Sequence, residues 1–139
     1  MSAYGWAIVA ACVWGIVPLL EKTGLGQSNP AAGVWVRSLG VVLGVLVFGF
    51  AWRPWRHLEG LPPSRMALLM LGGLLASFIG QMAFYQALKR GSVSQVTPVA
   101  GAYPLISVIL GWIILREPVT FTRFIGAACI VAGLIFLRR

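Results

Sequence analysis

Residues 66–88, MALLMLGGLLASFIGQMAFYQAL, are the stretch that decides the fold of this chain. They contain no charged side chain, and the run closes on Lys89, Arg90 and Gly91. About 20 apolar residues are enough for an α-helix to cross the hydrocarbon core of a bilayer. A helix satisfies its own backbone groups in lipid, and the run lacks the alternation of a barrel strand. The stretch therefore predicts one membrane-spanning helix.

The composition of the whole chain points to the same class. Of its 139 residues 59% are apolar and 10% are charged, whereas soluble domains have about 45–50% apolar and about 25% charged residues. A soluble domain of this length could not bury so much apolar surface in one core. The same numbers exclude intrinsic disorder, and the two cysteines exclude a disulfide scaffold. The net charge of +8 does not indicate a nucleic-acid partner, because most basic residues flank apolar runs, where lipid headgroups lie.

Four further apolar runs accompany the first one. The five predicted spans are residues 3–20, 31–51, 66–88, 93–115 and 121–137. We therefore expect an all-α membrane protein with five transmembrane helices in a single domain, residues 1–139. No Lys or Arg precedes the first run, and no clean cleavage site followed by polar sequence comes after it, so the first span is expected to stay in the protein.

The basic residues divide equally between the two sides of such a five-span chain. One side receives Arg53, Arg56, Arg65, Arg116 and Arg123, and the other receives Lys22, Lys89, Arg90, Arg138 and Arg139. Orientation is normally fixed by an excess of Lys and Arg facing the cytoplasm. Equal counts favour insertion in both orientations, and thus an antiparallel homodimer, the two-chain form of an inverted repeat. The alternative is that one or two charges near the span ends carry more weight and fix one orientation.

Polar side chains recur on one face of the third span. Gly73, Ser77, Gln81 and Tyr85 are spaced every four residues, which places them in one stripe along a helix. Polar groups are costly in lipid, so such residues usually face protein or a water-filled cavity. Small-residue stripes are also helix-packing faces, but Gln81 and Tyr85 favour a cavity here.

Charged residues lie at or inside the first two spans. Arg37 stands inside the second span, where a guanidinium stays charged and needs a partner or water, unless it reaches the nearby interface. We expect it to anchor an anionic or carboxylate group. Glu21 and Lys22 follow the predicted end of the first span. They have two readings, a role in gating or coupling and a solvated pair at the helix end.

Aromatic residues and prolines complete the candidate pathway. Trp14 shares a face of the first span with Glu21, and the fourth span contains Pro98, Tyr103 and Pro104. Two prolines interrupt a helix and leave backbone carbonyls unpaired, which must face protein or water. Interrupted helices often mark binding sites in transporters. We expect Trp14 and Tyr103 to form aromatic walls of a cavity.

Signals for catalysis are weak. His57 is single and lies in a loop, and Cys12 and Cys129 belong to different spans, so no metal-ligand spacing occurs. Three acids, none clearly in mid-membrane, leave no carboxylate pair for acid–base chemistry. We expect no enzyme activity, no metal and no cofactor.

Several short motifs are spread over nearly the whole chain. They are Trp14–Gly15 through Lys22, Pro30 and Arg37, Tyr85–Lys89 through Pro104, Glu117–Pro118, Ile125–Ala128 and Ala132–Gly133. Together they resemble an EamA-type domain of the drug/metabolite transporter superfamily. The resemblance implies five helices per domain, with two inverted domains making a ten-helix transporter in most members. It also implies that another chain supplies the second half here.

Related small multidrug-resistance proteins carry an essential glutamate midway along their first helix. The corresponding stretch here is Ala10–Val13, which contains no carboxylate. This departure argues against a proton-coupled cation exchanger of that type.

The resemblance and the polar pathway together predict an inner-membrane transporter for a small metabolite or drug-like solute. It would work by alternating access as a homodimer, rocking one five-helix unit against the other. The expected cavity residues are Arg37, Ser77, Gln81, Tyr85, Trp14 and Tyr103, with Glu21 and Lys22 in gating or coupling. Two alternatives remain, a subunit of a flippase for lipid-linked substrates and a non-transporting membrane partner of a larger complex.

Overall fold

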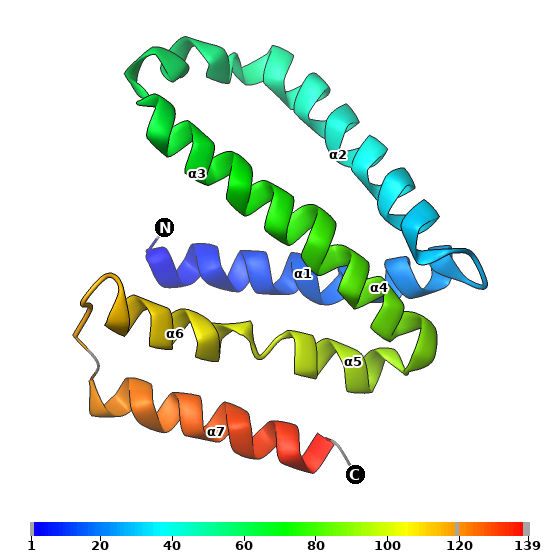
Figure 1. Cartoon of the computed structure of the whole chain (residues 1–139), viewed down its shortest axis with the longest axis vertical. Helices are drawn as coiled ribbons and strands as arrows, with labels where there is room; N and C mark the ends of the chain where they lie inside the picture. The colour runs from blue at the N-terminus through cyan, green and yellow to red at the C-terminus, as the bar shows by residue number, and fades with distance from the viewer. Residues whose placement is uncertain (1, 119, 138–139) are drawn as a thin grey trace. The chain divides into compact units, whose positions relative to one another are not determined.

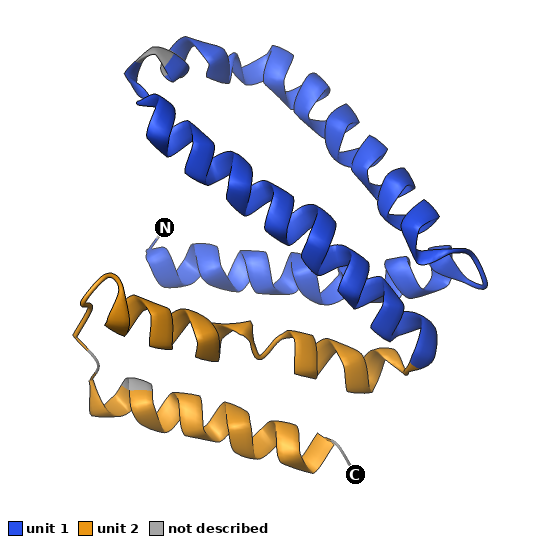
Figure 2. Ribbon diagram, in the orientation of Figure 1, with its two compact units in different colours: residues 1–90 blue, residues 91–139 orange. Residues whose placement is uncertain are grey.

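The computed structural model of the chain describes residues 2–118 and 120–137, without the side chains of residues 57, 59 and 123. Arg138 and Arg139, which enter the charge count, lie outside these described residues. Every regular element in the described part is a helix, as the composition predicts (Figure 1). The chain divides into two compact units, residues 1–90 and 91–139 (Figure 2).

The first unit consists of three long helical segments. They are α1 (Ala3–Leu25), α2 (Pro30–Trp52) and an unbroken segment made of α3 (Pro63–Leu74), a π-helical stretch (Leu75–Gly80) and α4 (Gln81–Arg90). A 3₁₀-helix, Pro54–Gly60, follows α2 and precedes α3. In Figure 1 the segment from α3 to α4 runs as one helix.

Local sequence explains how α1 ends and α2 begins. Gly26 ends α1 with a φ of 47°, a left-handed value that favours glycine. The Asn29 side chain accepts a hydrogen bond from the backbone N–H of Ala31 at 2.9 Å, and Pro30 occupies the first turn of α2. Both are common features of helix starts. The connection between the two helices is therefore short and well defined.

The three segments of the first unit pack together at one end. There α4 contacts both α1 and α2, and four side chains are at most 4% exposed, namely Leu25, Val34, Tyr85 and Leu88. A Cβ atom added to Gly33 would lie 2.7 Å from the Tyr85 ring and 2.8 Å from Leu25 Cδ1, so any larger residue would force one of these side chains to shift. We call these five residues the helix junction.

Two lysine side chains link the helical segments by hydrogen bonds at the same end of the first unit. The ammonium group of Lys22 donates a hydrogen bond to the carbonyl of Leu88, and that of Lys89 donates to the carbonyl of Ser28 at 3.3 Å. Carbonyls at a helix C-terminus have no partner within the helix, so the Lys22 bond satisfies one of them. The end of α1, the start of α2 and the end of α4 are thus held together by packing and by hydrogen bonds.

The second unit contains an interrupted helix and a final one. Helix α5 (Val93–Ala100) and helix α6 (Tyr103–Ile113) are separated by a turn at Gly101 and Ala102, and α7 (Phe121–Leu137) contacts both. The break falls between Pro98 and Pro104, so the interruption that the prolines predict is confirmed.

Among the residues that the structure describes, four helical segments are long and apolar enough to cross a membrane. They are Ala3–Leu25, Pro30–Trp52, Pro63–Arg90 and Val93–Ile113, with a shorter apolar stretch at Phe124–Leu137. Most large apolar side chains in them are exposed, as expected where lipid or another helix covers them. The chain is therefore an all-α, multi-pass membrane protein, and α1 continues five residues beyond the end of the first predicted span.

Candidate functional site

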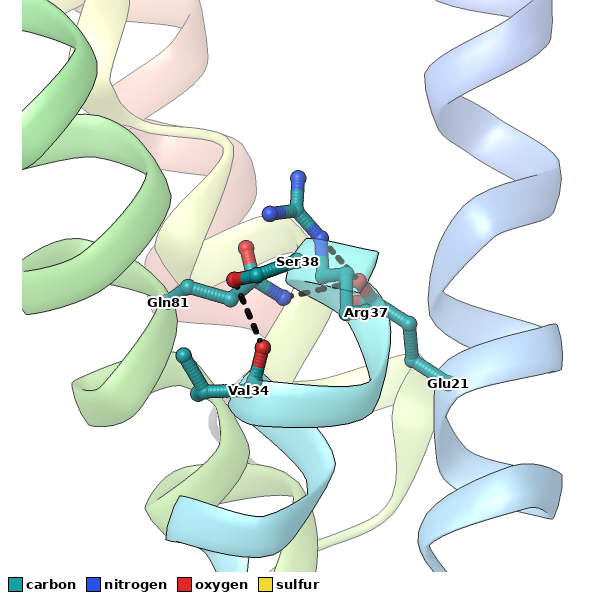
Figure 3. A network of polar contacts seen from close by, with 5 residues as sticks. All are labelled: Glu21, Val34, Arg37, Ser38 and Gln81. Atoms are coloured by element: carbon teal, nitrogen blue, oxygen red, sulfur yellow. Dashed lines mark hydrogen bonds and ion pairs between the residues drawn. The ribbon is translucent and has the colours of Figure 1, made fainter. Parts of the chain in front are cut away.

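The polar centre of the first unit is a network formed by one side chain from each of α1, α2 and α4. Glu21 Oε1 accepts a hydrogen bond from Arg37 Nε at 3.1 Å and another from Gln81 Nε2 at 2.8 Å. Figure 3 shows these side chains converging from the three helices. One carboxylate oxygen therefore connects the three segments of the unit.

The network lies inside helices long enough to cross the membrane. The Glu21 side chain is 9% exposed and that of Arg37 is 31% exposed. Arg37 stands seven positions after Pro30, about 10 Å along the axis of α2 at 1.5 Å per residue. A single charge at the centre of a membrane helix costs about 2.5–3.5 kcal/mol on insertion scales. The ion pair lowers this cost because the two charges cancel.

Part of the Arg37 guanidinium remains unpaired. Its Nη1 atom is buried and has no hydrogen-bond partner among the described residues. In Figure 3 the terminal nitrogens point away from both Glu21 and Gln81. A guanidinium offers five donors in a planar fork that matches a carboxylate or a phosphate. Glu21 uses only the Nε donor, so the Nη1 donor keeps its hydrogen-bonding capacity unused among the described residues.

A cavity of about 320 Å³ adjoins the ion pair. Its polar walls come from Glu21, Ser28, Arg37 and Tyr85. Apolar and small residues form the rest, namely Leu20, Gly24, Leu25, Ala32, Gly33 and Val36. The volume is at the small end of the range for ligand sites, about 300–1,000 Å³. The cavity therefore combines a charged pair with an aliphatic wall.

Three of the predicted cavity residues meet in this unit. Arg37 and Gln81 share Glu21 as a partner, and Tyr85 lines the same cavity while its ring packs against Gly33. Gln81 and Tyr85 are the part of the four-residue stripe that reaches the network.

Three other predicted residues lie outside the network. Trp14 is 61% exposed on α1, and Ser77 is exposed in the π-helical stretch. Tyr103 belongs to the second unit, where it lines a cavity of about 640 Å³ together with residues that include Ser107 and Glu117. The described residues contain no cluster of three or more metal-ligating side chains.

Glu21 and Lys22 are not a solvated pair at a helix end, so that reading is wrong. Helix α1 continues to Leu25, and both side chains make contacts to other elements. The predicted span ends at the first charged residue, although no glycine or proline stands between Pro18 and Gly24. Spacing gave a signal, because Trp14, Pro18 and Glu21 share one face only if the helix extends past Leu20.

Comparison with known proteins agrees with this description. The chain matches the model of the EamA-like transporter family over residues 1–139. It is 25% identical over 132 residues to an uncharacterized transporter in the cobO 3′ region of Sinorhizobium sp, covering 95% of this chain and 93% of that protein. It is 26% identical over 136 residues to the uncharacterized transporter YvbV of Bacillus subtilis, covering 96% of this chain and 41% of that protein. No solved structure matches the chain.

Proposed function

The chain belongs to the EamA-like transporter family, and from this premise we propose that it carries a small anionic solute across the inner membrane by alternating access. The observation that carries the proposal is the buried, unpaired end of Arg37 beside a cavity of about 320 Å³. A fixed cation inside a membrane helix attracts an anion strongly, because little water screens it there. The aliphatic wall formed by residues such as Leu20, Leu25 and Val36 favours an anion with a short apolar body.

The proposed working unit is an antiparallel homodimer. Two observations support it, the equal charge count on the two sides of the chain and the 41% of the Bacillus protein that the chain matches. The longer relative has room for a second segment of this size. Inverted repeats place the substrate site at the repeat interface and alternate access by rocking one repeat against the other. In this proposal the exposed faces of the spans meet a second, inverted copy.

Uptake by the purified protein in liposomes tests the transport proposal. Ketoisocaproate is a suitable probe, because it joins a carboxylate to a branched aliphatic body. We expect saturable uptake of radiolabelled ketoisocaproate that excess unlabelled probe competes. Isoamylamine has a similar apolar body with an ammonium group and should not compete, since Arg37 repels it. Uptake no faster than in protein-free liposomes, or competition by isoamylamine, would exclude the proposed substrate class.

Cysteine labelling in native membranes tests the orientation. In a variant lacking Cys12 and Cys129, single cysteines are placed at Gln27, between α1 and α2, and at Gly60, the last residue of the 3₁₀-helix between α2 and α3. These two connections follow opposite ends of α2. Both positions are exposed, and a Cβ at Gly60 meets open space. If the dimer is antiparallel, an impermeant reagent added from one side labels about half of the copies at each position. Labelling of only one position from that side would mean a single orientation and would exclude the antiparallel homodimer.

A further inference from the structure

We propose that Glu21 takes up one proton each time an anion binds to Arg37, so that anion and proton cross the membrane together. This inference rests on the proposed function and adds its coupling ion. It is drawn from the charge of the network, from the bonds that hold Glu21, and from the identity of Gln81.

The charge of the site has to remain near zero. Without solute, Arg37 and Glu21 form an ion pair, and their charges cancel. An anion bound to the free end of Arg37 would leave one net negative charge inside the membrane helices, which lipid surroundings disfavour. A proton on Glu21 restores neutrality. Anion binding and protonation of Glu21 therefore favour each other, and this coupling is reciprocal.

The geometry allows the exchange without a large movement. Arg37 contributes only its Nε to Glu21, at 3.1 Å. Once Glu21 is neutral, this bond weakens and Arg37 can turn toward the bound anion. In the complete step a hydronium ion of the solvent breaks one O–H bond and gives its proton to the Glu21 carboxylate, where a new O–H bond forms and water is left behind. The Arg37–Glu21 ion pair is replaced by an Arg37–anion pair. The net charge of the components is zero before and after the step.

Gln81 can hold Glu21 in both protonation states. When Glu21 is ionised, as in the structure, the Gln81 amide N–H donates to its carboxylate at 2.8 Å. When Glu21 is protonated, the carbonyl oxygen of the same amide can accept the O–H of the carboxylic acid. A lysine or an arginine at this position has donors only, so it would hold the charged form alone. Gln81 is thus a positioning residue for the exchange.

The other titratable groups near Glu21 do not replace it as the proton carrier. On α1, Lys22 donates to the carbonyl of Leu88, and on α4 Lys89 donates to the carbonyl of Ser28. Tyr85 on α4 lines the same cavity, and Arg37 on α2 stays charged. Among these described groups, Glu21 is the carboxylate that an anion on Arg37 would displace.

The test measures ketoisocaproate binding to the purified protein and the accompanying uptake of protons in weakly buffered solution. The wild type should take up about one proton per bound anion, and its dissociation constant should rise about tenfold per pH unit in the range where Glu21 is ionised. Glu21→Gln keeps an oxygen that accepts from Arg37 and Gln81 but cannot be protonated. It should bind the anion at least as tightly as the wild type, with no proton uptake and no pH dependence. Glu117→Gln removes a carboxylate in the second unit and should behave as the wild type.

Each outcome has one meaning. Binding by the wild type without proton uptake, or equal proton uptake in Glu21→Gln, overturns the coupling and leaves the anion transporter in place. If the wild type does not bind ketoisocaproate, the proposed function fails, and the coupling that rests on it fails as well.

Discussion

Replacing Arg37 with alanine abolishes ketoisocaproate uptake, with a fall of at least about a hundredfold at subsaturating solute. The variant loses the cation that attracts the anion, and it leaves the Glu21 carboxylate, 9% exposed, without its charged partner. Breaking a buried pair in this way costs about 3–5 kcal/mol. That cost falls on the stability of the fold. Removing one partner of a buried, hydrogen-bonded charge pair from a binding site costs about 2–5 kcal/mol of binding free energy, and a hundredfold fall corresponds to about 2.8 kcal/mol. Initial uptake rates in liposomes with equal protein content measure the effect.

A double variant separates transport from stability. Arg37→Met with Glu21→Met removes both charges and fills the site with apolar atoms of similar size, a change that is often neutral or stabilising for buried pairs. We expect its thermal midpoint in detergent to recover from that of Arg37→Ala, while uptake stays absent. Uptake near the wild-type rate in Arg37→Ala would remove Arg37 from the substrate path. Recovery of uptake in the variant that combines Arg37→Met with Glu21→Met would also remove Arg37 from the substrate path.

The second large effect is expected at Gly33, where a leucine should disrupt the helix junction. The first atom of the new side chain would already lie 2.7 Å from the Tyr85 ring and 2.8 Å from Leu25 Cδ1. The ring cannot turn away freely, because Tyr85 is only 3% exposed. Overpacking of this kind costs about 1–3 kcal/mol and sometimes more. We expect about 3 kcal/mol here, since leucine adds three further carbons, and thermal unfolding in detergent measures it.

Gly40 supplies the matched control for this variant. It lies on the same helix, and a Cβ built there meets nothing within 4 Å. Gly40→Leu gains helix propensity and should unfold at or above the wild-type temperature. If both variants unfold alike, the close approach at Gly33 does not contribute to stability.

The sequence predicts the helical class well, because long uncharged runs leave few alternatives in lipid. The interruption near Gly101 was also foreseeable, since Pro98 and Pro104 each remove a helix hydrogen bond. The network was predicted only in part. Arg37 and Gln81 stand out as polar groups inside apolar runs, and their choice needs no tertiary information.

Their common partner was harder to identify. Hydropathy falls at the first charge, so the sequence alone predicts a helix end at Glu21, whereas the helix in the structure continues to Leu25. Only the packing of α4 against α1 and α2 shows that one carboxylate oxygen serves two donors. Contacts of this kind, between residues 60 positions apart, depend on helix rotation and leave no local pattern in a single sequence.

The π-helical stretch at Leu75–Gly80 has a consequence for how this chain can vary in length. A π turn amounts to one extra residue inserted into an α-helix. Deleting a residue there would restore regular α-helix and keep the span continuous, but it would rotate α3 by about 100° relative to α4. The helix junction holds Tyr85 and Leu88 buried, and this fixes the rotation of α4. The extra residue of the π turn therefore determines which face α3 presents to its surroundings. A single insertion or deletion at this stretch can therefore exchange the partner surface of α3 while the charged network stays intact.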